Sequence, residues 1–239
     1  MLTPQENMRY YHIMSNRRFG RNSWRRRVSL MTVLCLGVPT SFAPSAHTAP
    51  SSAPTTQIQP TSEIVVGKAA CTLGFVLAGS DGMAEGLTAA HCGEVGRPVT
   101  TVDGTPIGTI VAHGPEGADI ARVDIATSLT VYAQVGTIGS VHDIIDIATL
   151  NTQRPLLCKQ GITTGLSCGP LIGKATEGYM TFAAATEHGD SGSPVYALTR
   201  SGELVAAGIL EGSEVDNPAI AVATPVKPFV ELWKMSVPR

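Results

Sequence analysis

From residue 63 onward, short apolar runs alternate with polar turn signals. The runs that are apolar or rich in β-branched residues lie at 72–77, 107–113, 120–125, 129–135, 180–185, 195–198, 204–210 and 220–223. Turn-forming pairs separate several of them, among them Asp81-Gly82, Asp103-Gly104 and Ser201-Gly202. Runs of this length bounded by such pairs predict β-strands joined by tight turns. Only 226–235 shows helical spacing of apolar residues, so the pattern predicts an all-β domain closed by a short C-terminal helix.

The first 62 residues follow a different pattern. Residues 1–27 are basic and lead into an apolar run of eleven residues, 28–38, which is followed by Pro39 and small residues. This order is typical of a secretory signal, which we assign to 1–43. The run is too short to span a bilayer, which needs about 20 apolar residues, so we expect no stable membrane insertion once the signal is removed.

Residues 44–62 are rich in Pro, Ser, Thr and Ala and show no apolar periodicity. Such a segment buries too little surface to fold alone, which indicates a linker or a short propeptide. The folded domain is therefore expected at 63–239, with a division into two halves near 140–153. The protein is expected outside the cell or in the cell envelope.

Charge narrows the classes of partner. The chain of 239 residues has a formal net charge of −2, but seven of its 17 basic residues and one of its 19 acidic residues precede residue 50. The remainder carries a net charge of about −8 and offers no basic stripe to replace phosphate counterions. Nucleic acid and anionic membranes are thereby disfavoured, and peptides or small molecules become the expected ligands.

Four cysteines remain when Cys35, inside the signal run, is set aside: Cys71, Cys92, Cys158 and Cys168. An even number in an exported chain indicates disulfides. Zinc is the rival interpretation, but the short Cys-x-x-Cys or His-x-x-x-His spacing usual for a zinc site is absent from the sequence, so we expect no metal and no cofactor. Of the three possible pairings we favour Cys71 with Cys92 and Cys158 with Cys168, because each closes a short sequential loop.

Three segments carry the groups that an attack on a peptide bond by a hydroxyl requires. Ser191 lies between glycines in Gly-Asp-Ser-Gly-Ser-Pro, where the backbone can aim successive N–H groups at one point. His91 ends an apolar run in Thr-Ala-Ala-His-Cys, and Asp119 opens another in Ala-Asp-Ile-Ala. A hydroxyl needs a base to take its proton and a charge to hold the resulting imidazolium, and these three side chains supply all the parts. Taken alone, Gly-Asp-Ser-Gly is also a good hairpin turn.

These motifs, in this order, resemble the His, Asp and Ser motifs of the chymotrypsin-like serine peptidases. The likeness is closer to the bacterial streptogrisin and α-lytic protease branch: the segment starting Cys71-Thr-Leu-Gly-Phe is similar to the opening strand of its first barrel, and Cys158-Lys-Gln-Gly-Ile-Thr-Thr-Gly to a segment of its second. The resemblance covers roughly residues 64–235. It implies two six-stranded antiparallel β-barrels, with His91 and Asp119 in the first and Ser191 in the second.

The resemblance also implies roles for neighbouring residues. The N–H groups of Gly189 and Ser191 would form the oxyanion hole. Asp190, behind the nucleophile, needs a partner because an unpaired buried carboxylate is very costly. In the bacterial branch a basic residue after a cysteine fills this role, which favours Lys159 here. In the animal enzymes a newly cut N-terminus does so, and the segment starting at Ile64 is the alternative.

For substrate binding, the resemblance places Ala185 at the floor of the specificity pocket, where trypsins carry an aspartate. Glu211, Gly212 and Ser213 would form the wall that pairs with the substrate backbone. Glu211 stands where the family usually has a serine, and Ser193 where it usually has a glycine. A preference for Lys or Arg side chains is therefore not supported.

Together these features predict a monomeric, secreted serine endopeptidase acting on protein or peptide substrates through an acyl-enzyme. The alternative is a catalytically silent binding module with the same fold, although all three triad residues are present. An esterase or lipase on an α/β sheet would need the chain order Ser, Asp, His, and the order here is His, Asp, Ser.

Overall fold

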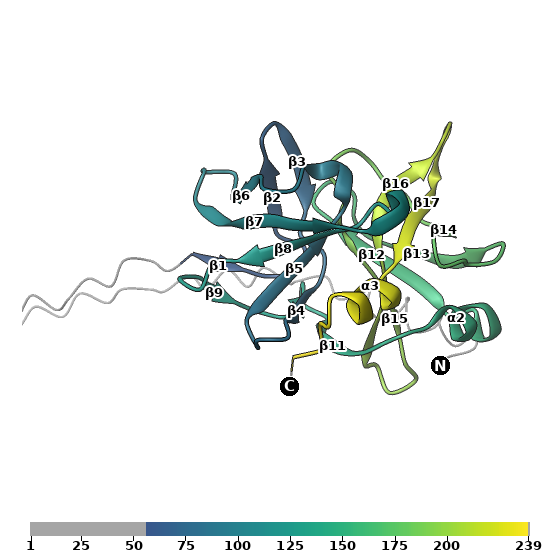
Figure 1. Ribbon diagram of the computed structural model, residues 1–239. Coiled ribbons are helices and arrows are strands. Elements are labelled where there is room, and N and C mark those ends of the chain that lie inside the picture. Colours follow the sequence, from purple (N-terminus) through teal and green to yellow (C-terminus); the bar gives the residue numbers. More distant parts are fainter. Residues whose placement is uncertain (1–55, 239) are drawn as a thin grey trace, which may run out of the picture.

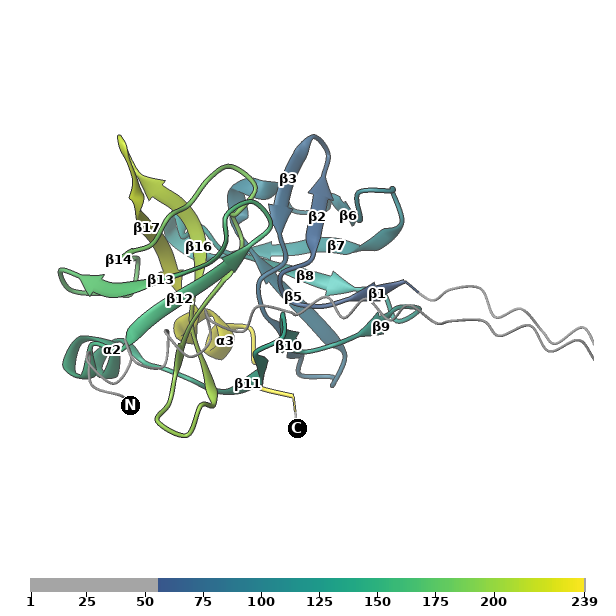
Figure 2. The ribbon, with the colours of Figure 1, turned by 180° about the vertical axis from the view of Figure 1, so that it is seen from behind.

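The computed structural model describes residues 56–238, which form two large β-sheets that pack side by side and one small two-stranded sheet (Figures 1 and 2). The predicted signal at 1–43 and most of the predicted linker lie outside the described residues. The first sheet carries His91 and Asp119, and the second leads into the loop that carries Ser191.

The first sheet has seven strands in the order β3-β2-β6-β7-β8-β5-β4, all paired antiparallel. They are β2 (Glu63–Val66), β3 (Ala69–Thr72), β4 (Val76–Ala78), β5 (Ala84–Thr88), β6 (Pro98–Thr100), β7 (Pro106–His113) and β8 (Ala121–Ile125). Its two end strands, β3 and β4, are consecutive in the chain and are separated by residues 73–75 alone. The sheet therefore rolls up on itself, and Leu73 and Phe75 from this connection are fully buried in its core.

The second sheet contains a closed six-stranded barrel. Its strands are β10 (Gln134–Val135), β11 (Gly139–Ile144), β12 (Leu156–Gly161), β13 (Gly165–Ile172), β14 (Met180–Ala183), β15 (Pro194–Leu198), β16 (Leu204–Glu214) and β17 (Asn217–Pro225). The order is β10-β11-β16-β15-β12-β13-β14-β17, and pairing of β16 with β17 closes the ring. The predicted all-β class and the six-stranded second barrel are confirmed. The first sheet differs from the expected barrel, because it has seven strands and its end strands do not pair with each other, and in the second sheet β11 joins the ring at β16 in parallel.

The packed chain begins before residue 63. Strand β1 (Gln57–Ile58) pairs in parallel with β9 (Thr130–Val131), and Ile58 is buried. The described end of the predicted linker thus covers part of the first sheet's core. In the chain, β9 lies between β8, the last strand of the first sheet, and β10, the first strand of the second.

Within residues 56–238 the structure has two α-helices, α2 (Ile147–Gln153) and α3 (Lys227–Leu232), and two short 3-10 helices, η1 (Ala90–Cys92) and η2 (Pro115–Gly117). Helix α3 is the predicted C-terminal helix. Helix α2 was not predicted: it has a single fully buried side chain, Leu150, although Asp146 caps its start by accepting a hydrogen bond from the Thr149 N–H. Neither α-helix is long and apolar enough to cross a membrane.

Two disulfides brace the strands near the candidate site. Cys71 in β3 is bonded to Cys92 in η1, and Cys158 in β12 to Cys168, its direct cross-strand partner in β13. These are the two pairs expected from the sequence. The first ties the helical turn that carries His91 to the sheet beneath it.

Candidate active site

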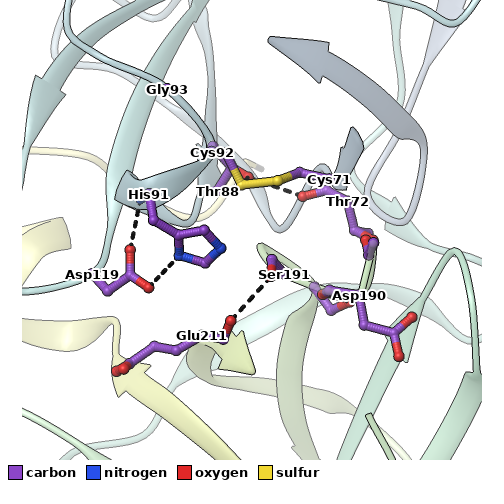
Figure 3. The surroundings of a disulfide bond; sticks show 12 residues. Cys71, Thr72, Thr88, His91, Cys92, Gly93, Asp119, Asp190, Ser191 and Glu211 are labelled. Carbon is purple, nitrogen blue, oxygen red and sulfur yellow. Dashed lines mark hydrogen bonds and ion pairs between the residues drawn. A yellow bond between two sulfur atoms is a disulfide. The ribbon is translucent and has the colours of Figure 1, made fainter. Parts of the chain in front are cut away.

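His91 and Asp119 meet because their strands are neighbours. His91 follows β5 in η1, Asp119 precedes β8, and these two strands pair antiparallel with Thr88 opposite Ala121. The Asp119 carboxylate holds the histidine twice: Oδ2 lies 2.6 Å from Nδ1, and Oδ1 accepts a hydrogen bond from the backbone N–H at 2.9 Å. The imidazole therefore has a fixed orientation, with its Nε2 facing away from Asp119 (Figure 3).

The pair is also coupled electrostatically. The hydrogen bond that His91 donates to Asp119 raises the pKa of His91, and this outweighs the lowering by burial. For Asp119, burial raises the pKa, but the hydrogen bonds from the His91 ring and backbone lower it more, so the net pKa is below its ordinary value. An imidazolium is thus stabilised next to an ionised carboxylate, as a general base requires.

Ser191 faces the imidazole from the second sheet (Figure 3). It lies in the loop between β14 and β15, and its carbonyl accepts a hydrogen bond from the Thr72 N–H of the first sheet at 2.8 Å. Its hydroxyl donates to the Glu211 carbonyl at 3.1 Å. The structure thus brings the three predicted residues together, with the hydroxyl turned towards Glu211 and not towards His91.

The two glycines around Ser191 adopt backbone angles that other residues rarely reach, with φ of +98° at Gly189 and +88° at Gly192. A Cβ at Gly192 would lie 2.2 Å from the Thr72 carbonyl oxygen. Within residues 56–238 the N–H groups of Gly189 and Ser191 donate no hydrogen bond, while the intervening Asp190 N–H donates to the Glu187 carbonyl. The predicted oxyanion-hole donors are therefore unengaged.

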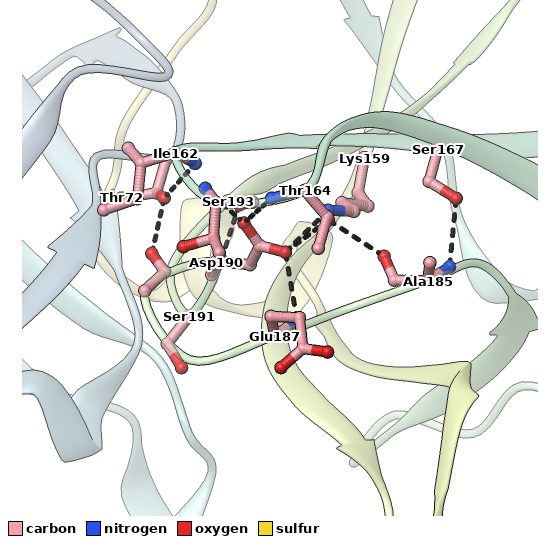
Figure 4. Close-up of polar contacts among 12 residues, drawn as sticks. Thr72, Lys159, Ile162, Thr164, Ser167, Ala185, Glu187, Asp190, Ser191 and Ser193 are labelled. Atoms are coloured by element: carbon pink, nitrogen blue, oxygen red, sulfur yellow. Dashed lines mark hydrogen bonds and ion pairs between the residues drawn. The ribbon is translucent and has the colours of Figure 1, made fainter.

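Asp190 lies behind the nucleophile with its side chain fully buried, and so does Lys159 (Figure 4). Lys159 Nζ is 2.8 Å from Asp190 Oδ2. Burial raises the pKa of Asp190, but the hydrogen bonds from Lys159 and Thr164 lower it by more than burial raises it. The net pKa is therefore below its usual range. The alternative partner, Ile64, is buried within β2, where it pairs with Cys71.

Threonine hydroxyls that the sequence reasoning did not assign complete this network. Thr164 Oγ1 donates to Asp190 Oδ2 at 2.5 Å. Thr72 Oγ1 donates to the Gly189 carbonyl at 2.8 Å, and Thr88 Oγ1 to the Thr72 carbonyl at 3.0 Å. Both Thr72 and Thr88 are fully buried. In the sequence these threonines stand within or near the cysteine and histidine segments, an arrangement too common to assign a role.

The residues predicted to bind substrate lie on two segments around the serine loop. Ala185 is exposed, and its N–H donates to Ser167 Oγ at 3.0 Å. Glu211, Gly212 and Ser213 are in β16, where Gly212 and Ser213 pair with β17. Ser193 is buried, and its hydroxyl donates to the Asp190 carbonyl at 2.5 Å. It thus supports the loop from behind and does not face a substrate.

One group of potential metal ligands occurs in the described residues, formed by Cys71, His91 and Cys92, whose ligand atoms lie within 4.8 Å of one another. The two sulfurs are joined in a disulfide. This group therefore lacks the thiolates that a zinc site of this composition would need.

The arrangement of the two large sheets is chymotrypsin-like, and comparisons with solved structures agree. Thermobifida fusca Protease A is 24% identical, with a TM-score of 0.61, and the match covers 76% of this chain and 98% of that one. The Nocardiopsis protease NAPase is 21% identical, with a TM-score of 0.61 and coverages of 77% and 100%. A glutamic acid specific serine protease, described as using a histidine triad in substrate binding, is 20% identical, with a TM-score of 0.62 and coverages of 76% and 100%.

No protein-family model matches the sequence, and no curated protein matches it. The fold likeness therefore comes from structure alone. The chain shares the two-barrel fold of bacterial chymotrypsin-like serine proteases.

Proposed function

We propose that this protein is a secreted serine endopeptidase that cleaves protein or peptide substrates, acting as a monomer. The observation that carries the proposal is the doubly held His91 and Asp119 pair of one sheet facing Ser191 of the other, beside two unengaged N–H donors. The fold neighbours are serine proteases, which supports the same class of reaction. Export is supported by the basic and apolar N-terminal segment and by the two disulfides.

In the proposed reaction, Ser191 first turns its hydroxyl from the Glu211 carbonyl to Nε2 of His91, by rotation about its Cα–Cβ bond. Nε2 takes the proton while Oγ bonds to the substrate carbonyl carbon, and the carbonyl oxygen becomes an oxyanion. The N–H groups of Gly189 and Ser191 then donate to that oxyanion. The imidazolium returns the proton to the leaving amine, and water hydrolyses the acyl-enzyme by the same steps.

Hydrolysis of fluorescein-labelled casein tests the proposal. The mature domain should release soluble fluorescent peptides, and Ser191→Ala should abolish this release. Ser201→Ala, which removes a hydroxyl from an exposed turn, is the matched control and should leave the rate unchanged. Turnover by Ser191→Ala equal to the wild type would refute the assignment. Binding of casein without cleavage by the wild type would favour the silent binding module.

A further inference from the structure

Glu211 places a second carboxylate beside the His91 and Asp119 pair, and the proposed mechanism uses only its backbone. Its carbonyl oxygen accepts the Ser191 hydroxyl at 3.1 Å. Its side chain extends away from the serine towards the Asp119 side of the site (Figure 3). There Oε1 accepts a hydrogen bond from Thr224 Oγ1 at 2.7 Å.

The backbone around Glu211 is irregular in a way that fixes this placement. Leu210 pairs with Ala223 and Gly212 with Val222, so Glu211 is the extra residue of a β-bulge in β16. Bulges redirect a side chain that would otherwise follow the pleat. Thr224, on the neighbouring strand β17, is fully buried and anchors the redirected carboxylate. The bulge in β16 and the Thr224 hydrogen bond from β17 together fix the position of the Glu211 carboxylate.

The charges of Asp119 and Glu211 both raise the pKa of His91. Thr224, the contact from β17, is neutral. Burial raises the pKa of Glu211 and the Asp119 charge raises it further, while the Thr224 hydrogen bond lowers it. A half-buried carboxylate near an existing one is costly when ionised. A protonated His91 offsets part of this cost, because its positive charge lowers the pKa of Glu211.

We propose that Glu211 is a positioning residue for His91: held by Thr224 and the bulge, its carboxylate acts through space to stabilise the imidazolium. The inference rests on the proposed function for its role in turnover. As the proton moves from Ser191 Oγ to Nε2, positive charge develops on the ring, and a second nearby negative charge favours that state. The oxygen–hydrogen bond of the serine breaks, the nitrogen–hydrogen bond of the imidazolium forms, and Glu211 exchanges no proton.

A histidine titration by NMR tests this without requiring turnover. In a Ser191→Ala background, the His91 ring signal is assigned by comparison with His91→Ala and followed across pH with and without Glu211→Gln. The neutral side chain should lower the pKa of His91 by about 0.5 to 1 unit. Glu211→Asp, which keeps the charge, should restore most of the shift. Glu203→Gln, which removes a carboxylate paired with exposed His142, is the matched control and should leave His91 unchanged.

The pH profile of kcat/KM gives the second readout, in the active enzyme. Glu211→Gln should move the acid limb to lower pH and lower the plateau, whereas a merely structural role would lower the plateau alone. An unshifted His91 titration would overturn the inference. The inference would also be overturned if Glu211→Gln left the pH profile of kcat/KM unshifted and raised KM for cationic substrates alone. That result would make Glu211 a substrate contact. A shifted titration in a protein that hydrolyses no peptide would refute the proposed function and leave the electrostatic coupling established.

Discussion

Replacing Lys159 by methionine probes the buried ion pair behind the nucleophile, in which a lysine of the apolar strand β12 faces Asp190. The substitution retains most of the side-chain volume and removes the charge that faces Asp190. Asp190 would keep four of its five donors: Thr164 Oγ1, and the N–H groups of Thr163, Thr164 and Glu187. Its negative charge would have no cationic partner in the buried site.

The size of the effect follows from burial. Both side chains are 0% exposed, and removing one partner of a buried pair typically costs about 3–5 kcal/mol because the other charge is left uncompensated. The four remaining donors offset part of this, so we expect a loss of about 2–4 kcal/mol in the free energy of unfolding at neutral pH. Adding Asp190→Asn should recover more than half of the loss, because it removes the stranded charge.

The sign of the pH dependence follows from the pKa of Asp190. In the wild type the folded-state pKa is lowered, so the carboxylate contributes stability above its unfolded value of about 3.8 and loses it as pH falls through the folded-state pKa. Without Lys159, the hydrogen bond that most lowers the pKa of Asp190 is lost, while burial still raises that pKa. The pKa of Asp190 should then rise, and the difference in stability between Lys159→Met and wild type should shrink as pH falls.

Urea unfolding followed by circular dichroism, with the disulfides intact, measures these differences. Lys227→Met is the matched control, because Lys227 pairs with Glu231 on the surface, where the two side chains are 40% and 67% exposed. An exposed pair four residues apart in a helix is worth about 0.3–0.5 kcal/mol. A loss for Lys159→Met no larger than that of Lys227→Met would refute the argument that Lys159 neutralises Asp190.

Three further predictions concern the base, the aspartate that orients it, and the serine loop. Because the Asp119 hydrogen bond raises the pKa of His91 above 6.5, and the neutral ring is the base, kcat/KM should fall as pH drops, with a midpoint above 6.5. Asp119→Asn should lower kcat by several orders of magnitude, on the order of 10⁴, and a loss below tenfold would contradict the role of Asp119. Gly192→Ala should abolish activity and unfold at a lower urea concentration than Gly82→Ala. Gly82 is the control because it has a similar φ of +80° but open space around it. Equal stability of the two variants would refute the steric argument.

The sequence pattern was enough to predict those elements whose apolar spacing follows the usual period of a strand or a helix. The runs at 107–113, 120–125 and 204–210 match β7, β8 and β16 to within a residue at their starts, because these strands alternate or bury apolar residues in the usual way. Helix α3 was found by its apolar spacing. The motifs around His91, Asp119 and Ser191 singled out side chains that the fold brings together, since each motif combines a chemical group with a local backbone requirement.

Other features depend on contacts distant in sequence. Strand β12 was missed because Lys159 breaks its apolar pattern, and its partner Asp190 is 31 residues away. Strand β5 contains Glu85, whose charge is paired with Arg122 of β8, so its pattern also looked too polar. The bulge at Glu211 is set by the register with β17. Pairwise contacts of this kind leave no periodic signal in the chain.

The central claim is that Ser191 is a nucleophile activated by His91, and covalent labelling tests it most directly. The mature domain is treated with a fluorophosphonate, digested, and mapped by tandem mass spectrometry. We predict one adduct, on Ser191, that forms in the wild type and is strongly reduced in His91→Ala. An adduct on Ser193 in place of Ser191, or labelling of Ser191 that is unaffected by loss of His91, would contradict the account.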